Sequence, residues 1–398
     1  MKEYILENGI KLIYIKGTSE LTSISIGLEA GAAQDGNLLG LAHATEHMIY
    51  KGTKNRSEAM INEEFSKLFG FSNAMTNFPY VIYYGSLLGE EFYKGIQLFS
   101  DLLINPTFPN DGFKEEMDVI VEELNEWDEE LDQYCEDKLL YNTFEKNRLK
   151  YPIIGNIESL NKITLEDIRR FYNEFYSPKN TSIAIVTSLE FTKVKDIIEE
   201  CFGNWSGEMV NAAPESEEQG KVGIFGDKRN SNSCRVQMNF SIDNLNEVEM
   251  KALRIFNEYF AEGINSLLFD RLRTKNGLVY DVLSRISCEK YINLYKITYT
   301  TSKDKIDKTF EVINEAINDI KLLDDNTIMG LVKRIKIKKL FKEEQSIQLA
   351  KELSTYSVMF KDYKVYYNMA KDMENIKGDF ILEVAKKVLK KSSIEIIS

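Results

Sequence analysis

The chain contains only two histidines, His43 and His47, and their spacing is the first feature that could support catalysis. Residues four apart in a helix share one face, and Glu46 lies between the two histidines on that same face. Two imidazoles in this arrangement can bind one zinc ion, because both ring nitrogens reach a common point at about 2 Å. A hydrolytic zinc site also needs a third protein ligand and an open position for water. A carboxylate or a thiolate must supply that ligand, since no other histidine exists; the competing interpretation is a pair of surface or core-edge histidines.

An acidic segment from Phe113 to Leu140, predicted as one long helix, offers many carboxylates. At about 100° per residue, Glu116 and Glu123 lie within roughly 20° of each other at one border of its apolar stripe, whereas Glu122 and Glu126 point towards solvent. The stripe, which should face the core, consists of Met117, Ile120, Val121, Leu124, Trp127 and Leu131. Helical phase therefore favours Glu116 or Glu123 as the third ligand and does not separate them.

The elements that must position these residues are short strands and helices in both halves of the chain. Strands are predicted at Ile10–Ile15, Ser23–Leu28, Ser72–Thr76, Tyr80–Ser86, Thr181–Thr187, Lys221–Phe225, Arg235–Ser241, Val279–Cys288 and Asn293–Thr301. Helices are predicted at Leu39–Tyr50, Ser57–Phe69, Glu90–Ile104, Phe113–Leu140, Leu165–Tyr176 and Asp304–Leu322.

The order strand, strand, helix occurs at Ser72–Ile104 and again at Val279–Leu322, which we interpret as a faint internal duplication. Residues 206–220 (SGEMVNAAPESEEQG) are poor in large apolar side chains and are predicted to be a linker. We therefore expect an α+β fold with two homologous domains, 1–205 and 221–398. Each should contain a mostly antiparallel sheet packed with helices.

Composition limits the possible partners. The 398 residues carry a formal net charge of −13 and no basic stripe, which argues against binding nucleic acid. The charges from Lys2 to Lys16 leave no room for the apolar stretch of a signal peptide. The longest uncharged run, Leu68–Gly89, reads as strands and not as a membrane span. Four scattered cysteines without a CxxC pair fit free thiols, so we expect a cytoplasmic protein.

The sequence around the histidines resembles the signature of the pitrilysin-like zinc metallopeptidases, family M16. The five residues from His43 to His47 (HATEH) fit the inverted zincin motif HxxEH within GLAHATEHMIYKGT. In that family the third zinc ligand is a glutamate 76 residues after the second histidine, at the end of a V-I-x-E-E sequence; Glu123 occupies this position. The family's supporting glutamate, seven residues earlier, corresponds to Glu116. The resemblance thus implies one Zn²⁺ per chain held by His43, His47 and Glu123, with Glu46 as general base and Glu116 as the orienting carboxylate.

Two further segments resemble the family and imply how a peptide would bind. Residues 70–76 (GFSNAMT) are similar to the G-G-x-x-N-A-x-T edge strand beside the zinc, with Asn73 and Ala74 at its Asn-Ala. Residues 266–282 (SLLFDRLRTKNGLVYDV) are similar to S-R-L-F-x-x-L-R-E-K-x-G-L-x-Y in the second half. Arg273 and Tyr280 fall on the Arg and Tyr that reach the bound peptide, and the resemblance makes Tyr280 a donor to the oxyanion. Leu267 stands in place of the family's Arg after the serine, which bears on substrate preference.

The resemblance also implies a partner. In the family the active chamber closes between two clamshell halves, each made of two such domains, and a chain of this length supplies one half. The favoured interpretation is an endopeptidase that acts on short or unfolded peptides as a homodimer. The alternatives are a catalytic subunit that processes a dedicated precursor peptide with a related chain, and a non-catalytic, peptide-binding scaffold.

Overall fold

The computed structural model describes residues 1–208, 218–229 and 233–398 and divides the chain into two compact units. Unit 1 comprises Met1–Glu126, Tyr151–Glu215 and Phe341–Tyr366. Unit 2 comprises Trp127–Lys150, Ser216–Leu340 and Tyr367–Ser398. Most of the predicted linker 206–220 lies outside the described residues, which omit 209–217.

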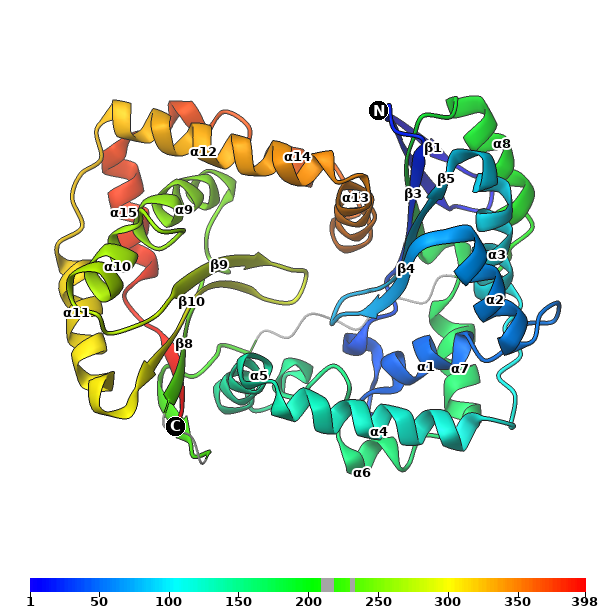
Figure 1. Ribbon diagram of the computed structural model, residues 1–398, viewed down its shortest axis with the longest axis horizontal. Helices are drawn as coiled ribbons and strands as arrows, with labels where there is room; N and C mark the ends of the chain where they lie inside the picture. The colour runs from blue at the N-terminus through cyan, green and yellow to red at the C-terminus, as the bar shows by residue number, and fades with distance from the viewer. Residues whose placement is uncertain (209–217, 230–232) are drawn as a thin grey trace. The chain divides into compact units, whose positions relative to one another are not determined.

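Unit 1 contains a six-stranded sheet in the order β1-β2-β6-β3-β5-β4 (Figure 1). Neighbouring strands are antiparallel except β2 and β6, which run parallel. The strands span Lys2–Ile5 (β1), Lys11–Lys16 (β2), Leu21–Leu28 (β3), Phe69–Thr76 (β4), Val81–Leu88 (β5) and Thr181–Thr187 (β6). The strands predicted in the first half are confirmed, and β4 lies at one edge of the sheet.

Fifteen α-helices connect and cover the strands in the described part of the chain. Those of the first half are α1 (Leu41–Ile49), α2 (Glu58–Leu68), α3 (Phe92–Ile104), α4 (Phe113–Glu129), α5 (Leu131–Thr143), α6 (Ile157–Leu160), α7 (Leu165–Phe175) and α8 (Phe191–Phe202). Those of the second half are α9 (Glu247–Phe260), α10 (Leu267–Phe269), α11 (Ile306–Asn318), α12 (Asp325–Glu344), α13 (Ser346–Phe360), α14 (Val365–Asn368) and α15 (Gly378–Val388).

Helices cover both faces of the sheet in unit 1, with α13 on one face and α2, α3 and α8 on the other (Figure 1). Successive side chains of a strand point to opposite faces, so β3 presents Ser25 to one side and Ile24 to the other. Ser25 Oγ lies 2.7 Å from Ser354 Oγ of α13, in a buried hydrogen bond. Helix α13 therefore packs on the small polar residues of β3, while the isoleucines face the apolar core.

Unit 2 contains a five-stranded sheet in the order β7-β11-β8-β10-β9. The strands span Gly223–Asp227 (β7), Ser233–Ser241 (β8), Val282–Cys288 (β9), Asn293–Ser302 (β10) and Ser393–Ile397 (β11). Only β7 and β11 pair in parallel. When β1 is left out, each sheet places its strands in the same order along the chain: first, fifth, second, fourth, third. The parallel pair also occupies the same place in both, so the topology supports the duplication that the sequence predicts.

Each half of the chain contributes one helix to the other unit. Helix α5 precedes the second half, yet it packs on β8 and β11 of unit 2. Helix α13 follows the second half's sheet strands up to β10, yet it packs on β3, β5 and β6 of unit 1. The predicted domains, 1–205 and 221–398, are contiguous, whereas these compact units are not. The division into two homologous domains at 1–205 and 221–398 therefore stays a prediction.

The single helix predicted from Phe113 to Leu140 is wrong, because it is two helices. Glu130 adopts an extended conformation (φ −70°, ψ 100°), which ends α4 at Glu129 and begins α5 at Leu131. Helix α5 packs on the sheet of unit 2, whereas the part of α4 that carries Glu116 and Glu123 belongs to unit 1.

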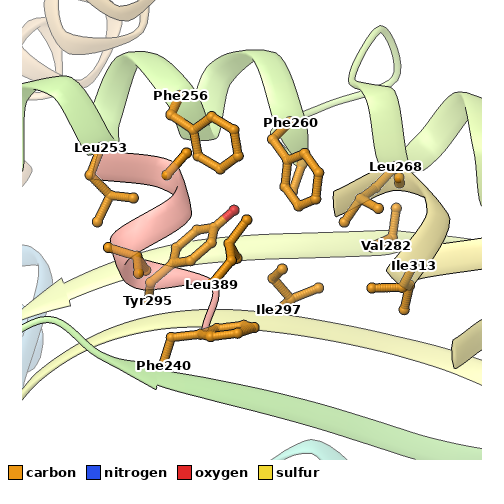
Figure 2. Packing of buried hydrophobic residues seen from close by; sticks show 14 of the residues in the cluster. Phe240, Leu253, Phe256, Phe260, Leu268, Val282, Tyr295, Ile297, Ile313 and Leu389 are labelled. Atoms are coloured by element: carbon orange, nitrogen blue, oxygen red, sulfur yellow. The ribbon is translucent and has the colours of Figure 1, made fainter. Parts of the chain in front are cut away.

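The core of unit 2 lies between its sheet and the helices α9, α11 and α15 (Figure 2). Tyr295 and Ile297 of β10 are fully buried beneath Phe256 and Phe260 of α9. The two phenylalanines stack with ring centroids 4.9 Å apart, as expected for side chains one helical turn apart. Large apolar side chains at helical and strand periods thus account for this packing.

No helix in the described part of the chain combines the length and apolar character needed to span a membrane. The uncharged run Leu68–Gly89 forms β4, β5 and their connections, as predicted.

Candidate metal centre

Helix α1 carries His43, Glu46 and His47, and its first turn is held tightly. Gly40 precedes the helix with φ +89°, and a Cβ at this position would lie 2.3 Å from the carbonyl oxygen of Ile154, so only glycine fits. The carboxylate of Asp35 accepts hydrogen bonds from the backbone N–H groups of Gly40 and Ala42, both at 2.8 Å. These bonds satisfy donors that a helix N-terminus leaves unpaired.

His43, His47 and Glu123 come together as predicted. One potential ligand atom from each of them lies within 4.8 Å of the other two. Glu123 Oε1 is 3.7 Å from His43 Nε2, and its Oε2 is 3.4 Å from His47 Nε2. Tetrahedral ligands about 2.1 Å from a zinc ion stand about 3.4 Å apart, so two imidazoles and a carboxylate at these distances fit zinc. Their roles as ligands stay a prediction.

Glu116 contacts His47 at the ring nitrogen that lies away from Glu123. Its Oε1 lies 2.8 Å from His47 Nδ1, and this contact favours the tautomer with the proton on Nδ1. The other ring nitrogen of His47, Nε2, is the one that faces Glu123. The two glutamates that helical phase left open thus take different positions: Glu123 faces the ligand cluster, and Glu116 faces the far nitrogen of His47.

The charges of this cluster suit a cation. Burial and the neighbouring His47 lower the pKa of His43 to about 4, so His43 is neutral at neutral pH, the form in which imidazole binds metals. Burial by itself would lower the pKa of His47, but hydrogen bonds with Glu116 and Glu123 outweigh it and raise the pKa to about 10. The same hydrogen bonds from His47 lower the pKa of both glutamates. The carboxylates of Glu116 and Glu123 therefore stabilise a positive charge on His47, and a divalent cation can take the place of its proton.

Glu46 lies beside the cluster and is buried. Its Oε2 accepts a hydrogen bond of 2.8 Å from the hydroxyl of Thr76, the last residue of β4. Burial raises the pKa of Glu46 above the usual value of a glutamate, which suits a group that must both take and return a proton. The sequence analysis did not predict this role for Thr76, although Thr76 is the last residue of the GFSNAMT segment that resembles the family.

Strand β4 presents a free edge beside this helix, since within the described residues it pairs only with β5. Asn73 is exposed, and its Oδ1 accepts a hydrogen bond of 2.9 Å from the backbone N–H of Ala74. An edge strand can pair with an extended peptide. That Asn73 and Ala74 bind substrate stays a prediction.

Arg273 and Tyr280 lie in unit 2, and their contact with a peptide at the metal centre stays a prediction. Arg273 stands in a π-helical turn, Asp270–Lys275. Its guanidinium carbon lies 4.8 Å from the centroid of the Tyr280 ring, and Tyr280 is 80% exposed. The pair therefore forms a stacked, solvent-facing unit and not the half-buried aromatic of an ordinary core.

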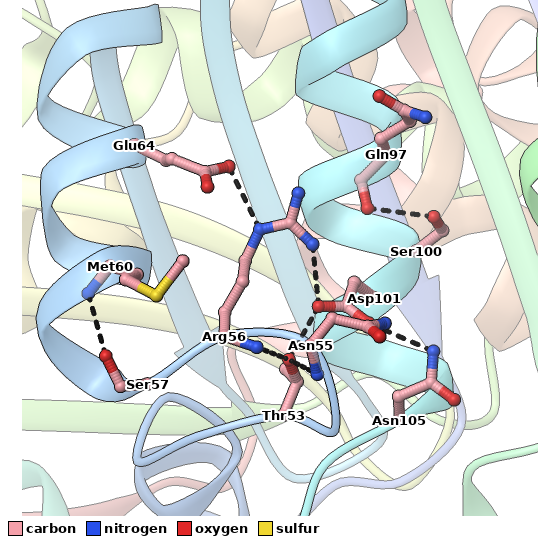
Figure 3. A network of polar contacts seen from close by, with 10 residues as sticks. All are labelled: Thr53, Asn55, Arg56, Ser57, Met60, Glu64, Gln97, Ser100, Asp101 and Asn105. Carbon is pink, nitrogen blue, oxygen red and sulfur yellow. Dashed lines mark hydrogen bonds and ion pairs between the residues drawn. The ribbon is translucent and has the colours of Figure 1, made fainter.

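The loop between α1 and α2 is held by the buried carboxylate of Asp101, which accepts four hydrogen bonds (Figure 3). Oδ2 accepts from Thr53 Oγ1 at 2.6 Å and from Arg56 Nη1 at 2.7 Å. Oδ1 accepts from the side-chain amides of Asn55 at 2.6 Å and Asn105 at 3.0 Å. All four lone-pair directions are used, so this loop is fixed to α3.

Asp101→Asn is expected to lower the free energy of unfolding by about 3 kcal/mol, because the new NH₂ group faces two of the donors and Arg56 Nη1 loses its charged partner. Urea denaturation measures the change. Asp118→Asn is the control: Asp118 is exposed on α4 and pairs with Lys114 one turn away at 3.5 Å, so a change below about 0.5 kcal/mol is expected. Equal changes in the two variants would contradict a structural role for the network.

Comparisons with known proteins find matches to both halves of the chain. A family model described as Insulinase (Peptidase family M16) matches residues 12–157, and one described as Peptidase M16 inactive domain matches residues 162–325. Both histidines, Glu116 and Glu123 fall within the first match. The uncharacterised zinc protease YmxG of Bacillus subtilis is 24% identical over 324 residues, which cover 81% of this chain and 78% of that protein.

Two more similarities concern a processing enzyme and a fold. The beta subunit of the mitochondrial-processing peptidase of Saccharomyces cerevisiae is 30% identical over 202 residues, which cover 50% of this chain and 44% of that protein. The crystal structure of a protease from Helicobacter pylori shares the fold, with a TM-score of 0.90 at 17% identity over 100% of this chain and 99% of that one. With matches to both of its domain models and to zinc proteases along most of its length, this chain belongs to peptidase family M16.

Proposed function

We propose that this chain is a zinc-dependent endopeptidase that hydrolyses short or unfolded peptides. The observation that carries the proposal is the convergence of His43, His47 and Glu123 within 4.8 Å, with Glu46 held alongside by Thr76. When bound by the first three residues, zinc supplies Lewis-acid activation of water and of the scissile carbonyl.

The chain's own residues perform the proton transfers. Glu46, which is not one of the three ligands, takes the proton of the attacking water and returns it to the leaving amine. Thr76 holds one oxygen of that carboxylate through its hydroxyl, which leaves the other oxygen for the proton. Glu116 holds His47 by Nδ1 and so orients the ring.

The substrate is proposed to bind as an extra strand along β4, near Asn73 and Ala74. Backbone hydrogen bonds at a sheet edge bind extended peptides of many sequences, which favours unfolded substrates over folded ones. From the second half, Tyr280 is proposed to donate to the oxyanion and Arg273 to hold a peptide carbonyl or the C-terminal flank. Cleavage inside a closed chamber would require a second half, supplied by another copy of this chain.

The alternative partner is a related chain, with this one as the catalytic subunit for a dedicated precursor. Similarity to the beta subunit of a mitochondrial-processing peptidase supports it. Light scattering on the lone protein, with hydrolysis measured on the same sample, separates the two arrangements: an inactive monomer favours the heterodimer. A non-catalytic scaffold is disfavoured by the intact ligand set and by Glu46. A cytoplasmic location stays part of the proposal.

The purified protein is expected to contain about one zinc ion per chain and to cleave an unstructured peptide. Elemental analysis together with mass spectrometry of the cleaved peptide measures both. Stoichiometric zinc without cleavage would point to a missing partner or a narrow substrate. Absence of zinc after reconstitution would contradict the site, and the scaffold would take its place.

A further inference from the structure

The chain leaves α1 through Lys51, whose ammonium group lies between two carboxylates. Lys51 Nζ is 3.1 Å from Glu116 Oε2 and 2.7 Å from Glu58 Oε1. The Lys51 side chain is only 12% exposed, so these ion pairs are poorly screened by water. A lysine placed here carries positive charge to the side of Glu116 that faces away from the metal site.

Glu116 uses its two oxygens for two different partners. Oε1 contacts His47 Nδ1 at 2.8 Å, and Oε2 contacts Lys51. A carboxylate held at both oxygens cannot rotate about its terminal bond without breaking one contact. Lys51, Glu116 and His47 thus form a continuous chain of contacts that ends at a proposed zinc ligand.

The backbone that carries Lys51 is itself fixed on both sides. Its N–H donates to the carbonyl of Met48 in the last turn of α1, at 3.2 Å. The next residue, Gly52, accepts hydrogen bonds from the backbone N–H and the hydroxyl of Thr107, at 3.0 and 3.1 Å. The residue after Gly52, Thr53, joins the Asp101 network (Figure 3). The lysine is therefore presented to Glu116 by a loop with little freedom.

We propose that Lys51 is a positioning residue for the metal centre: it holds Glu116 in the orientation that binds His47 Nδ1 and so directs Nε2 towards the metal. The proposal rests on the proposed function. The competing role is a plain structural one, in which Lys51 ties this loop to α2 through Glu58. The two roles differ in the partner through which Lys51 acts, and this difference sets the experiment.

Zinc affinity, measured by competition with a chromogenic chelator, is the first readout. Lys51→Met is expected to weaken zinc binding about 10-fold, the lower end of what loss of an outer contact costs a metal site. Lys51→Arg keeps the charge and is expected to restore most of that affinity. Lys54→Met is the matched control, because Lys54 lies on the same loop with an exposed side chain, and it should bind zinc as the natural protein does.

A double-mutant cycle identifies the partner. If Lys51 acts through Glu116, Lys51→Met should weaken zinc binding little further once Glu116→Gln is present. Additive effects with Glu116→Gln, or non-additive effects only with Glu58→Gln, would overturn the proposal in favour of the structural role. Unchanged zinc affinity in Lys51→Met would overturn it as well.

The two histidines allow a readout that needs no metal. In protein labelled with ¹⁵N-histidine only His43 and His47 give ring signals, so the Nδ1–H of His47 bonded to Glu116 can be observed directly. That signal should broaden or shift in Lys51→Met and be kept in Lys51→Arg and Lys54→Met. An unchanged signal in metal-free Lys51→Met would overturn the positioning role. Failure of the natural protein to bind zinc would instead overturn the proposed function, and the role of Lys51 with it.

Discussion

Glu46→Gln should abolish nearly all peptide hydrolysis while leaving zinc in place. The amide has the size of the carboxylate and can still accept the hydrogen bond from Thr76, but it cannot take a proton from water. General acid–base catalysis contributes factors of 10² to 10⁴, so we expect kcat to fall about 10³-fold. Quenched-fluorescence peptide assays give kcat and KM, and elemental analysis of the same sample gives the zinc content.

The control for this variant is Glu115→Gln, which removes an exposed carboxylate of α4 and should change neither quantity. Because Glu46 contacts no substrate backbone in the proposed role, KM should move much less than kcat. A zinc-loaded Glu46→Gln protein with near-natural kcat would contradict the assignment of the base. Loss of zinc along with activity would show that Glu46 supports the site and would leave the base unidentified.

The parts of this site that follow from local pattern were predictable. Two histidines one helical turn apart, with a glutamate between them, share a face whatever the rest of the fold does. Helical phase also placed Glu116 and Glu123 on the inner border of α4. It could not choose between them, because they lie seven residues, or about 10 Å, apart along the axis. Only the position of α4 along α1 decides which of them faces the Nε2 atoms of both histidines and which faces Nδ1 of His47.

Contacts between different helices and strands were harder to predict from the sequence. Thr76 and Lys51 both stand inside segments that the sequence had singled out, GFSNAMT and GLAHATEHMIYKGT, yet neither pattern shows which carboxylate each one meets. For Lys51 a signal existed: it continues the series of His43 and His47 at four-residue spacing. The contact of Lys51 with Glu116 depends on a loop that is fixed by Asp101, forty-eight residues from Thr53.

The exchange of helices between the two units could not be read from periodicity. An amphipathic helix shows which of its faces is buried, but not which sheet buries it. The apolar stripe that runs from Met117 to Leu131 therefore looked like one helix. In the structure only its last residue, Leu131, belongs to α5, and the extended Glu130 separates α5 from α4. The strand order, by contrast, repeats in both units, which the recurring strand, strand, helix order had indicated.

Glu123→Gln should cost the protein its zinc. The amide is neutral and a poor zinc ligand, so two imidazoles would remain to hold the ion. Loss of an outer contact costs 10- to 100-fold in metal affinity, and loss of a direct ligand should exceed that, at more than about 100-fold. The dissociation constant is measured by chelator competition on freshly reconstituted protein, and hydrolysis should fall in step with occupancy.

Three neighbouring glutamates of α4 make this a graded test of the geometry. Glu122→Gln, next to Glu123 but exposed, should keep natural affinity, because its carboxylate points away from the histidines. Glu116→Gln removes the contact with His47 Nδ1 and should fall between the two. If Glu116→Gln bound zinc more weakly than Glu123→Gln, Glu116 and not Glu123 would be the third ligand. Equal effects of Glu122→Gln and Glu123→Gln would mean that net charge, and not coordination, holds the metal here.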